Sequence, residues 1–312
     1  MGNCVAQRLD VVDLFAGLGG FSAGAQEAGA RVVWAANHWP VACRFHAANH
    51  PTVVHVQQDL MQADWRNVPK HDVLLASPAC QGHTPARGKE KPHHDALRST
   101  AWAPVGCLEH HRSDYAVIEN VPNFTRWVLY PSWVDALHRL GYSVSPHIID
   151  SADHGVPQNR VRLFLVCAKS RHPIKLPLPK RQEAHAASFI EWDAHDWSQI
   201  HRPGRSKKTL DRIQAGRREF GDRFLIPYYS SGSGLKGRSI HRPLGTVTTV
   251  DRWAVIDGER MRMLQPTELR AAMGFRASYL LPETRRDAIH LLGNAVCPPV
   301  AADLIAALAT AA

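Results

Sequence analysis

Residues 72–84 read Asp-Val-Leu-Leu-Ala-Ser-Pro-Ala-Cys-Gln-Gly-His-Thr, and this stretch decides the fold that we predict. The apolar run that ends at Ala76 is typical of a strand buried inside a parallel sheet. A Ser-Pro turn then leads to Cys80, so a thiol follows the carboxyl end of that strand. Open α/β sheets bind their ligands at this edge. We therefore expect either a catalytic thiol or one more buried small residue, which is the usual state of a free cysteine.

The residues after the thiol form a loop that is rich in glycine and in positive charge. Between Gly82 and Pro92 the chain carries Arg87, Lys89 and Lys91. The glycines give the backbone freedom, and the cations suit an anion. We expect this loop to contact an anion.

Composition favours a folded, basic protein. The chain has 312 residues, of which 45% are hydrophobic, and its net charge is +9 with 19 further histidines. That size allows one large domain, or one domain with a smaller module. The charge favours a nucleic acid as partner, although a basic protein whose charge serves only solubility has the same balance.

The cysteines and the apolar segments indicate the compartment. The six cysteines are widely spaced and form no CxxC pair, which is typical of reduced thiols in a cytosol. No segment resembles a signal peptide, and no apolar run approaches the roughly 20 residues that span a bilayer. We expect a cytoplasmic protein that makes no contact with a membrane.

The first part of the chain suits a nucleoside cofactor. Leu9 to Phe15 predicts a strand, Ala16 to Gly20 a glycine-rich loop, Phe21 to Ala28 a helix, and Arg31 to Ala36 a second strand. This order begins a doubly wound sheet. The GxGG spacing differs from the GxGxxG that binds a dinucleotide, so a nucleoside without phosphates fits better.

Three polar residues follow later strands. Asn37 can hydrogen-bond a hydroxyl, or it is a turn residue. Asp59 can accept a hydrogen bond from the amine of an adenine, or it caps the next turn. Glu119 follows the strand Tyr115 to Ile118, so it faces the same crevice as the thiol or is an exposed loop acid.

Two further patterns leave alternatives open. Ala96 to His111 reads as a helix interrupted near Ala103-Pro104, and its Cys107 and histidines lack a second ligand pair, so we predict no metal site. Gln158, Arg160 and Arg162 alternate on an extended segment and share a face. That face suits a phosphate or a base edge, and it equally suits edge-strand salt bridges.

The rest of the chain predicts further elements around a basic insert. The segment from Lys169 to about Lys208 is rich in proline and basic residues and has little hydrophobic periodicity. A predicted flexible loop at 230–234 precedes Lys236 and Arg238. The predicted helices are 41–49, 133–140, 209–220 and 267–273, with an Ala-rich helix at the end. The predicted strands are 53–56, 142–149, 163–168, 246–250 and 253–256.

In chain order, these residues resemble the DNA (cytosine-5)-methyltransferase family, which uses S-adenosylmethionine. The matching motifs are Asp13 to Gly20, Pro78 to Gln81, Glu119 to Val121, Gln158 to Arg162, and Gly293 to Val296. The resemblance implies an α/β fold with a doubly wound, mostly parallel sheet of the Rossmann-like methyltransferase type. It also implies a catalytic domain over 1–168, a small target-recognition region over 169–245, and a return segment over 246–312 whose last helix packs on the catalytic domain.

The resemblance also assigns roles to residues. The cofactor S-adenosylmethionine would be bound by Phe15, Ala16, Gly17, Leu18, Gly19, Gly20, Asn37, Asp59, Asn294, Ala295 and Val296. The catalytic residues would be Cys80, Gln81, Glu119, Arg160 and Arg162. DNA would be contacted by Arg87, Lys89, Lys91, Gln158, Lys236 and Arg238.

The chemistry of such enzymes explains these residue types. A Cys80 thiolate would add to C6 of a cytosine flipped out of duplex DNA, which makes C5 nucleophilic. Glu119 would bind the N3/N4 edge and Arg162 the carbonyl edge of the base. The expected partners are duplex DNA and a cognate restriction endonuclease, and the expected state is a monomer.

Two departures from the family pattern keep alternatives in view. The family usually has proline before the nucleophile, where this chain has Ala79, and an acid at the ribose position, where this chain has Asn37. The alternatives are a cytosine-5 methyltransferase for RNA, a DNA-binding relative without catalysis, and a nicotinamide-dependent oxidoreductase on a similar sheet.

Overall fold

The computed structural model describes residues 8–79, 97–228 and 237–311, which fall into two compact units. The first unit comprises Met1–Asp150, Val161–Pro179 and Val296–Ala312, and the second comprises Ser151–Arg160 and Lys180–Ala295. Residues 246–295, which we had assigned to the return segment, thus lie in the second unit. The reason is that strands on both sides of residue 246 pair in one sheet.

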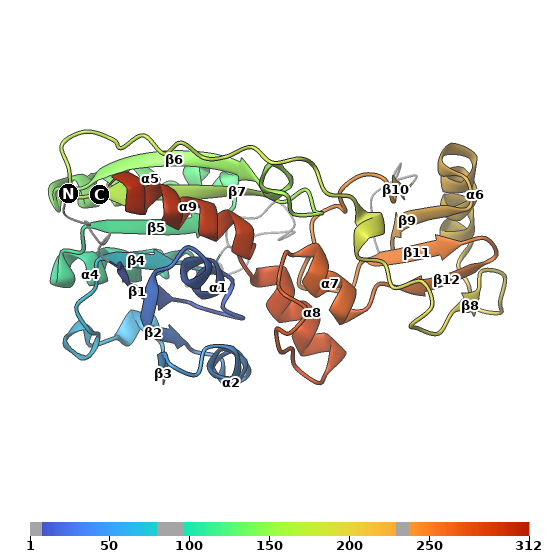
Figure 1. The fold of residues 1–312 in the computed structure, drawn as a ribbon, viewed down its shortest axis with the longest axis horizontal. Helices are drawn as coiled ribbons and strands as arrows, with labels where there is room; N and C mark the ends of the chain where they lie inside the picture. The colour runs from blue at the N-terminus through green and yellow to red at the C-terminus, as the bar shows by residue number, and fades with distance from the viewer. Residues whose placement is uncertain (1–7, 80–96, 229–236, 312) are drawn as a thin grey trace, which may run out of the picture. The chain divides into compact units, whose positions relative to one another are not determined.

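The first unit is built on a seven-stranded sheet in the order β3-β2-β1-β4-β5-β7-β6 (Figure 1). Only β7 runs antiparallel to its neighbours; the other strands run parallel to one another. This confirms the doubly wound, mostly parallel sheet. Its strands are β1 (Asp10–Leu14), β2 (Arg31–Asn37), β3 (Val54–Gln57), β4 (Val73–Ala76), β5 (Tyr115–Asn120), β6 (Ser143–Asp150) and β7 (Val161–Ala168).

The strand order reverses between β1 and β4, which is where such sheets bind ligands. Leu14 and Ala76, the last residues of these strands, lie opposite each other in register. The glycine-rich loop and the turn that leads to Cys80 therefore leave the sheet side by side.

Helices connect these strands. They are α1 (Gly20–Glu27), α2 (Pro40–Asn49), α4 (Trp102–His111), α5 (Tyr130–Arg139) and α9 (Pro298–Ala311), with the short 3-10 turns η1 (Leu60–Gln62), η2 (Trp65–Asn67) and η4 (Pro122–Arg126). The helical break that we predicted near Ala103-Pro104 lies at Thr100-Ala101 instead. Pro104 fits inside the first turn of α4 because the N–H that proline lacks has no helical partner there.

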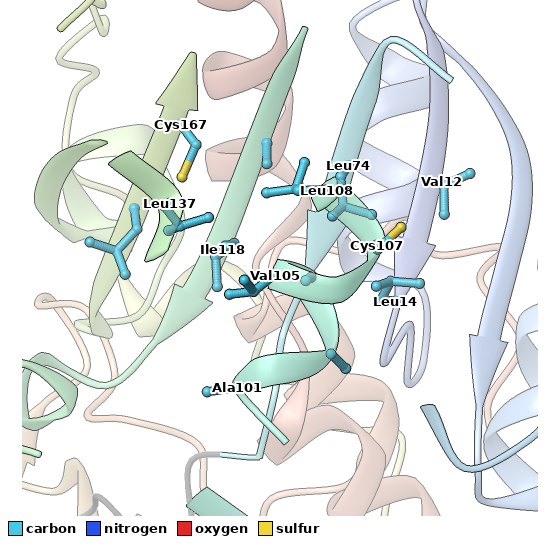
Figure 2. Close-up of a cluster of buried hydrophobic side chains, with 14 of the residues drawn as sticks. Val12, Leu14, Leu74, Ala101, Val105, Cys107, Leu108, Ile118, Leu137 and Cys167 are labelled. Carbon is cyan, nitrogen blue, oxygen red and sulfur yellow. The ribbon is translucent and has the colours of Figure 1, made fainter. Parts of the chain in front are cut away.

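The core of the first unit lies between the sheet and the helices α4 and α5 (Figure 2). Val12, Leu14, Leu74 and Ile118 from the strands pack with Val105, Leu108 and Leu137 from the helices, and all are buried. Cys107 and Cys167 lie in the same cluster, where burial raises the pKa of both thiols to about 12. These two thiols are therefore packing groups and not nucleophiles.

Helix α9 packs against α1 with backbone contact. A Cβ atom added at Gly20 would lie 1.9 Å from the Val296 carbonyl oxygen, and one added at Gly24 would lie 2.5 Å from the Ala301 Cβ. Only glycine permits this approach. The last segment of the chain thus returns to the helix that follows the glycine-rich loop.

The second unit contains a five-stranded antiparallel sheet in the order β10-β9-β11-β12-β8. Its elements are η5 (Ser151–His154), η6 (Ala186–Ser188), β8 (Ser198–Gln199), α6 (Lys207–Phe220), β9 (Arg223–Pro227), β10 (Arg238–Ser239), β11 (Trp253–Asp257), β12 (Arg260–Met263), α7 (Pro266–Ala272) and α8 (Arg285–Asn294). The strand predicted at 246–250 was wrong. Residues 246 and 247 bond the 158–160 segment instead of a neighbouring strand.

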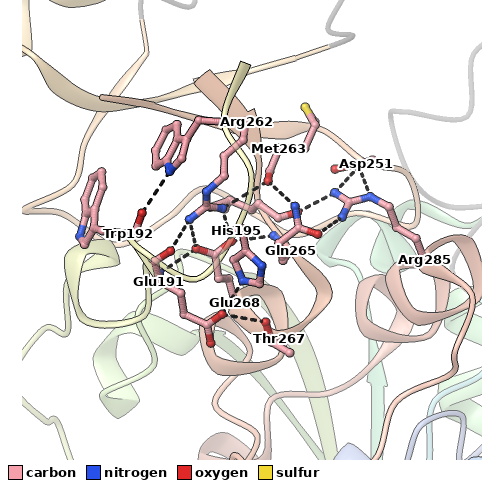
Figure 3. Close-up of polar contacts among 12 residues, drawn as sticks. Glu191, Trp192, His195, Asp251, Arg262, Met263, Gln265, Thr267, Glu268 and Arg285 are labelled. Atoms are coloured by element: carbon pink, nitrogen blue, oxygen red, sulfur yellow. Dashed lines mark hydrogen bonds and ion pairs between the residues drawn. The ribbon is translucent and has the colours of Figure 1, made fainter. Parts of the chain in front are cut away.

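A buried ion pair joins β12 to the start of α7 (Figure 3). The Arg262 guanidinium donates to both carboxylate oxygens of Glu268, at 2.7 and 2.8 Å, and both side chains are nearly inaccessible. Glu268 also accepts from the Gln265 backbone N–H, which completes a capping box. These bonds offset the cost of burying the charge pair, although the Arg262 Nε has no hydrogen-bond partner among the described residues.

Among the described residues, the stretch Arg285–Ala311 is long and apolar enough to cross a membrane. However, 83% of its apolar window is buried inside the protein, as in the core helix of a folded domain.

Candidate active site

The glycine-rich loop makes a tight turn between β1 and α1. Gly17 and Gly19 have φ of 56° and 96°, and Phe15 also has a positive φ, of 60°. The Gly19 N–H closes the turn by donating to the Ala16 carbonyl at 2.8 Å. A positive φ costs a bulky residue such as Phe15 free energy, and such strain concentrates at ligand sites.

Asn37 is the last residue of β2, and Asp59 lies two residues after β3. The Asn37 Oδ1 accepts the Trp39 backbone N–H at 3.0 Å, so it serves as a turn residue through that oxygen. Asp59 is exposed and caps η1 by accepting the Met61 N–H at 3.0 Å. An amide, a carboxylate and the aromatic Phe15 at the carboxyl ends of adjacent strands suit a cationic nucleoside, so this donor set fits S-adenosylmethionine.

The motif from Gly293 to Val296 is divided between the two units. Val296 lies against Gly20 in the first unit. Asn294 is exposed at the end of α8, and Ala295 is buried; both belong to the second unit.

The turn after β4 is held at each of its described residues. The Ser77 N–H donates to the Leu14 carbonyl at 3.2 Å, and the Pro78 carbonyl accepts from the Asn120 side-chain amide at 3.2 Å. The Ala79 N–H donates to the Thr100 hydroxyl at 3.1 Å. Several predicted site residues lie outside the described residues: Cys80, Gln81, Arg87, Lys89, Lys91 and Lys236.

Glu119 and Arg162 form an ion pair at the same edge of the sheet. The Arg162 Nε lies 3.1 Å from a Glu119 carboxylate oxygen, and the exposed fractions of the two side chains are 16% and 8%. Glu119 lies near the carboxyl end of β5, and Arg162 lies near the start of the antiparallel β7. The next residue, Asn120, bonds the turn before Cys80. The sequence did place Glu119 at this edge, but only the structure joins it to Arg162.

Gln158 and Arg160 differ from Arg162 in their surroundings. Gln158 is fully buried, and its amide accepts from the Val247 N–H and donates to the Ala272 carbonyl. Arg160 is 2% exposed and donates to the carbonyls of Val247, Gly293 and Ala295 at 2.8–3.0 Å. Gln158 therefore holds the fold of the second unit, and the DNA contact that we predicted for it is wrong.

Arg238 is partly engaged by the protein. Its Nη1 donates to the Asn159 side-chain oxygen and to the Pro243 carbonyl, both at 2.9 Å. It lines a cavity of about 450 Å³ in the second unit together with Arg242, Glu183 and Phe220.

The sequence did not reveal a row of hydrogen-bonded polar side chains that begins at Asp13 and Ser22, on either side of the glycine-rich loop. The Ser22 hydroxyl donates to Asp13 at 2.7 Å, His46 lies 3.1 Å from that hydroxyl, and His55 lies 2.8 Å from His46. Burial raises the pKa of Asp13 to about 7 and lowers the pKa of His46. The His50 ring lies next to that of His46, with the ring centroids 4.6 Å apart, and burial lowers the pKa of His50 to about 4.

No arrangement of three or more potential metal ligands occurs within the described parts of the chain.

Known proteins are similar to this chain over most of its length. A family model described as C-5 cytosine-specific DNA methylase matches residues 9–310. The Type II methyltransferase M1.HphI of Haemophilus parahaemolyticus is 29% identical, over 96% of this chain and 86% of that protein. M.HhaI of the same organism is 25% identical, over 92% of this chain and 90% of that protein. Among solved structures, DNMT2 of Spodoptera frugiperda has a TM-score of 0.69 and 20% identity, covers 96% of this chain and 99% of its own, and supports the fold.

Proposed function

The chain belongs to the family of C-5 cytosine-specific DNA methylases, and from that membership we propose its reaction. It transfers a methyl group from S-adenosylmethionine to C5 of a cytosine flipped out of duplex DNA, through a covalent adduct with Cys80. The observation that carries this proposal is the Glu119–Arg162 pair, 3.1 Å apart, at the edge where Asn120 holds the turn before Cys80.

The thiolate of Cys80 forms a bond to C6 of the base, and the electron pair of the C5–C6 double bond makes C5 nucleophilic. Glu119 binds the N3/N4 edge of the base and, in its protonated form, stabilises the negative charge that develops at N3. Arg162 binds the carbonyl oxygen and keeps Glu119 oriented through the ion pair. C5 then takes the methyl group, loses its proton to a base, and the thiolate leaves C6 as the double bond reforms.

S-adenosylmethionine supplies an electrophilic methyl group on a sulfonium. Phe15 and the loop from Ala16 to Gly20 bind this nucleoside, with Asn37 on the ribose and Asp59 on the adenine amine. Val296 contributes through its contact with Gly20 in the same unit.

The substrate is duplex DNA, in which stacking shields C6 from attack, so the target cytosine must leave the helix. Arg87, Lys89, Lys91, Lys236 and Arg238 contact its phosphates. The Type II relatives suggest that the enzyme protects DNA against a cognate restriction endonuclease. We propose that it acts as a monomer in the cytoplasm, bound to DNA.

The test measures transfer of labelled methyl from S-adenosylmethionine to mixed genomic DNA. We expect label at cytosine C5 with the wild type and a loss of at least about a hundredfold with Cys80→Ser, since the covalent nucleophile is gone. Cys43→Ser is the matched control. The Cys43 thiol donates a hydrogen bond to the Asn37 carbonyl, and the serine hydroxyl can donate the same bond.

Label in transfer RNA and none in DNA would mean that the substrate is RNA and leave the mechanism standing. Binding of DNA without transfer to either polymer would refute the catalytic proposal.

A further inference from the structure

One hydrogen bond in the turn after β4 exists only because residue 79 is not proline. The Ala79 backbone N–H donates to the Thr100 hydroxyl oxygen over 3.1 Å. Proline has no N–H, so the usual family residue at this position cannot make the bond. The bond joins residues 21 positions apart in the chain.

The Thr100 hydroxyl is oriented to accept. It donates its own hydrogen to the Leu97 carbonyl at 2.6 Å. A hydroxyl has one hydrogen and two lone pairs, so a lone pair is what it presents to Ala79.

The position of Thr100 is fixed by the core. The next residue, Ala101, is 1% exposed, and its carbonyl accepts from the indole N–H of Trp133 at 2.7 Å. Trp133 has no exposed surface and belongs to the main hydrophobic cluster. The acceptor for Ala79 is therefore tied to a rigid part of the first unit.

The same peptide group is held at its other end. The carbonyl oxygen of Pro78 and the N–H of Ala79 belong to one planar peptide unit. Asn120, which is 1% exposed, donates its side-chain amide to that carbonyl at 3.2 Å, while its own oxygen accepts the Val121 N–H at 2.9 Å. With both polar ends bonded, the peptide plane that precedes Ala79 has one orientation.

We propose that Thr100 is a positioning residue for the methyl transfer. Its hydroxyl fixes the peptide plane before Ala79 and so the position from which the main chain leads to Cys80. A proline ring fixes φ at about −65° covalently; here Thr100 supplies the constraint by a hydrogen bond. This inference rests on the proposed function, since it assigns Thr100 a role through the nucleophile.

The test compares methyl transfer by Thr100→Val, Thr100→Ser and the wild type, each with and without Ala79→Pro. Valine keeps the shape of threonine and lacks the hydroxyl, so we expect kcat to fall about tenfold while KM for S-adenosylmethionine stays unchanged. Serine keeps the hydroxyl, so the kcat of Thr100→Ser should match that of the wild type. In the Ala79→Pro background, Thr100→Val should change kcat less than about twofold, because no N–H remains to be held.

A second measurement is independent of turnover. The rate at which iodoacetamide alkylates Cys80, followed by mass spectrometry of its peptide, should change with Thr100→Val and not with Thr100→Ser. Thermal unfolding confirms that each variant is folded.

Equal losses with Thr100→Val and Thr100→Ser, or the same factor in both backgrounds, would overturn the inference. If the wild type transfers no methyl group, the proposed function has failed, and the alkylation rates alone then decide whether Thr100 orients the thiol. If Ala79→Pro is itself inactive, the comparison of Thr100→Val with Thr100→Ser in the background that retains Ala79 decides the inference.

Discussion

Asp13 is a single residue whose burial has a measurable consequence. Its side chain has no exposed surface, one carboxylate oxygen accepts from Ser22, and the other has no partner among the described residues. A charged carboxyl is costly in such a place, so burial raises its pKa from 3.8 to about 7. The folded state therefore holds the Asp13 proton more tightly than the unfolded chain does.

The sign of the pH dependence follows from that difference. Between pH 4 and 7 the folded state retains a proton that the unfolded chain has lost, so the Asp13 contribution to stability falls as the pH rises, and it is level above pH 7. In Asp13→Asn this contribution is absent. The free energy of unfolding of the variant should therefore rise relative to the wild type by about 4 kcal/mol across this range. Urea unfolding at pH 4.5, 6 and 8 measures it.

Asp64→Asn is the control for that measurement. Asp64 is exposed, and its hydrogen bonds with Arg66 lower its pKa, so removing it should give a small difference of the opposite sign. A difference between Asp13→Asn and the wild type that does not vary with pH would show that Asp13 ionises normally.

At the scale of elements, the contact between α1 and α9 depends on two glycines. A Cβ at Gly24 would lie 2.4 Å from the Pro298 carbonyl oxygen and 2.5 Å from the Ala301 Cβ. The helices must separate to admit it, and overpacking of this kind costs about 1–3 kcal/mol. Gly24→Ala should therefore lower the unfolding free energy, although alanine favours an isolated helix over glycine.

Thermal or urea unfolding checks the effect. Glu27→Ala, on the exposed last turn of α1, is the matched control and should change stability little. Stabilisation by Gly24→Ala would mean that α9 does not pack on α1 in solution.

Elements also show why local patterns mislead. Residues 246–250 are all threonine or valine, which favour a strand, yet the Gln158 and Arg160 side chains bond the backbone groups of Val247 that a strand would use. Ala103-Pro104 looks like a break, yet it fits within the first helical turn, and the break lies at Thr100-Ala101. A partner far away in the chain decided the first case, and the position of the proline within its own helix decided the second.

At the scale of the whole molecule, the net charge of +9 predicts how DNA binding depends on salt. Neutralising phosphates releases counterions, so the logarithm of the affinity falls linearly with the logarithm of salt concentration. Lys89→Gln removes one proposed phosphate contact and should reduce the slope by about one. Arg66→Gln, a surface residue paired with Asp64, should leave it unchanged. Fluorescence anisotropy from 50 to 300 mM salt measures the slope. Equal slopes for Lys89→Gln and the wild type would show that Lys89 makes no phosphate contact.

The sequence by itself determined the order of the elements, the parallel sheet, and the residue types at the strand ends. It could do so because apolar periodicity, glycine turns and strand-end chemistry are local properties that the chain carries in its spacing. It placed Cys80 and Glu119 after two strands of one sheet for this reason.

Only the tertiary structure decided which of these residues meet. The Glu119–Arg162 pair, the Ala79–Thr100 bond and the Asp13–Ser22 bond with its histidines join residues on different elements. It also turned Gln158 from an expected DNA contact into a buried support. The physical reason is that burial and hydrogen-bond partners depend on packing between distant segments, which leaves no periodic signal in the sequence.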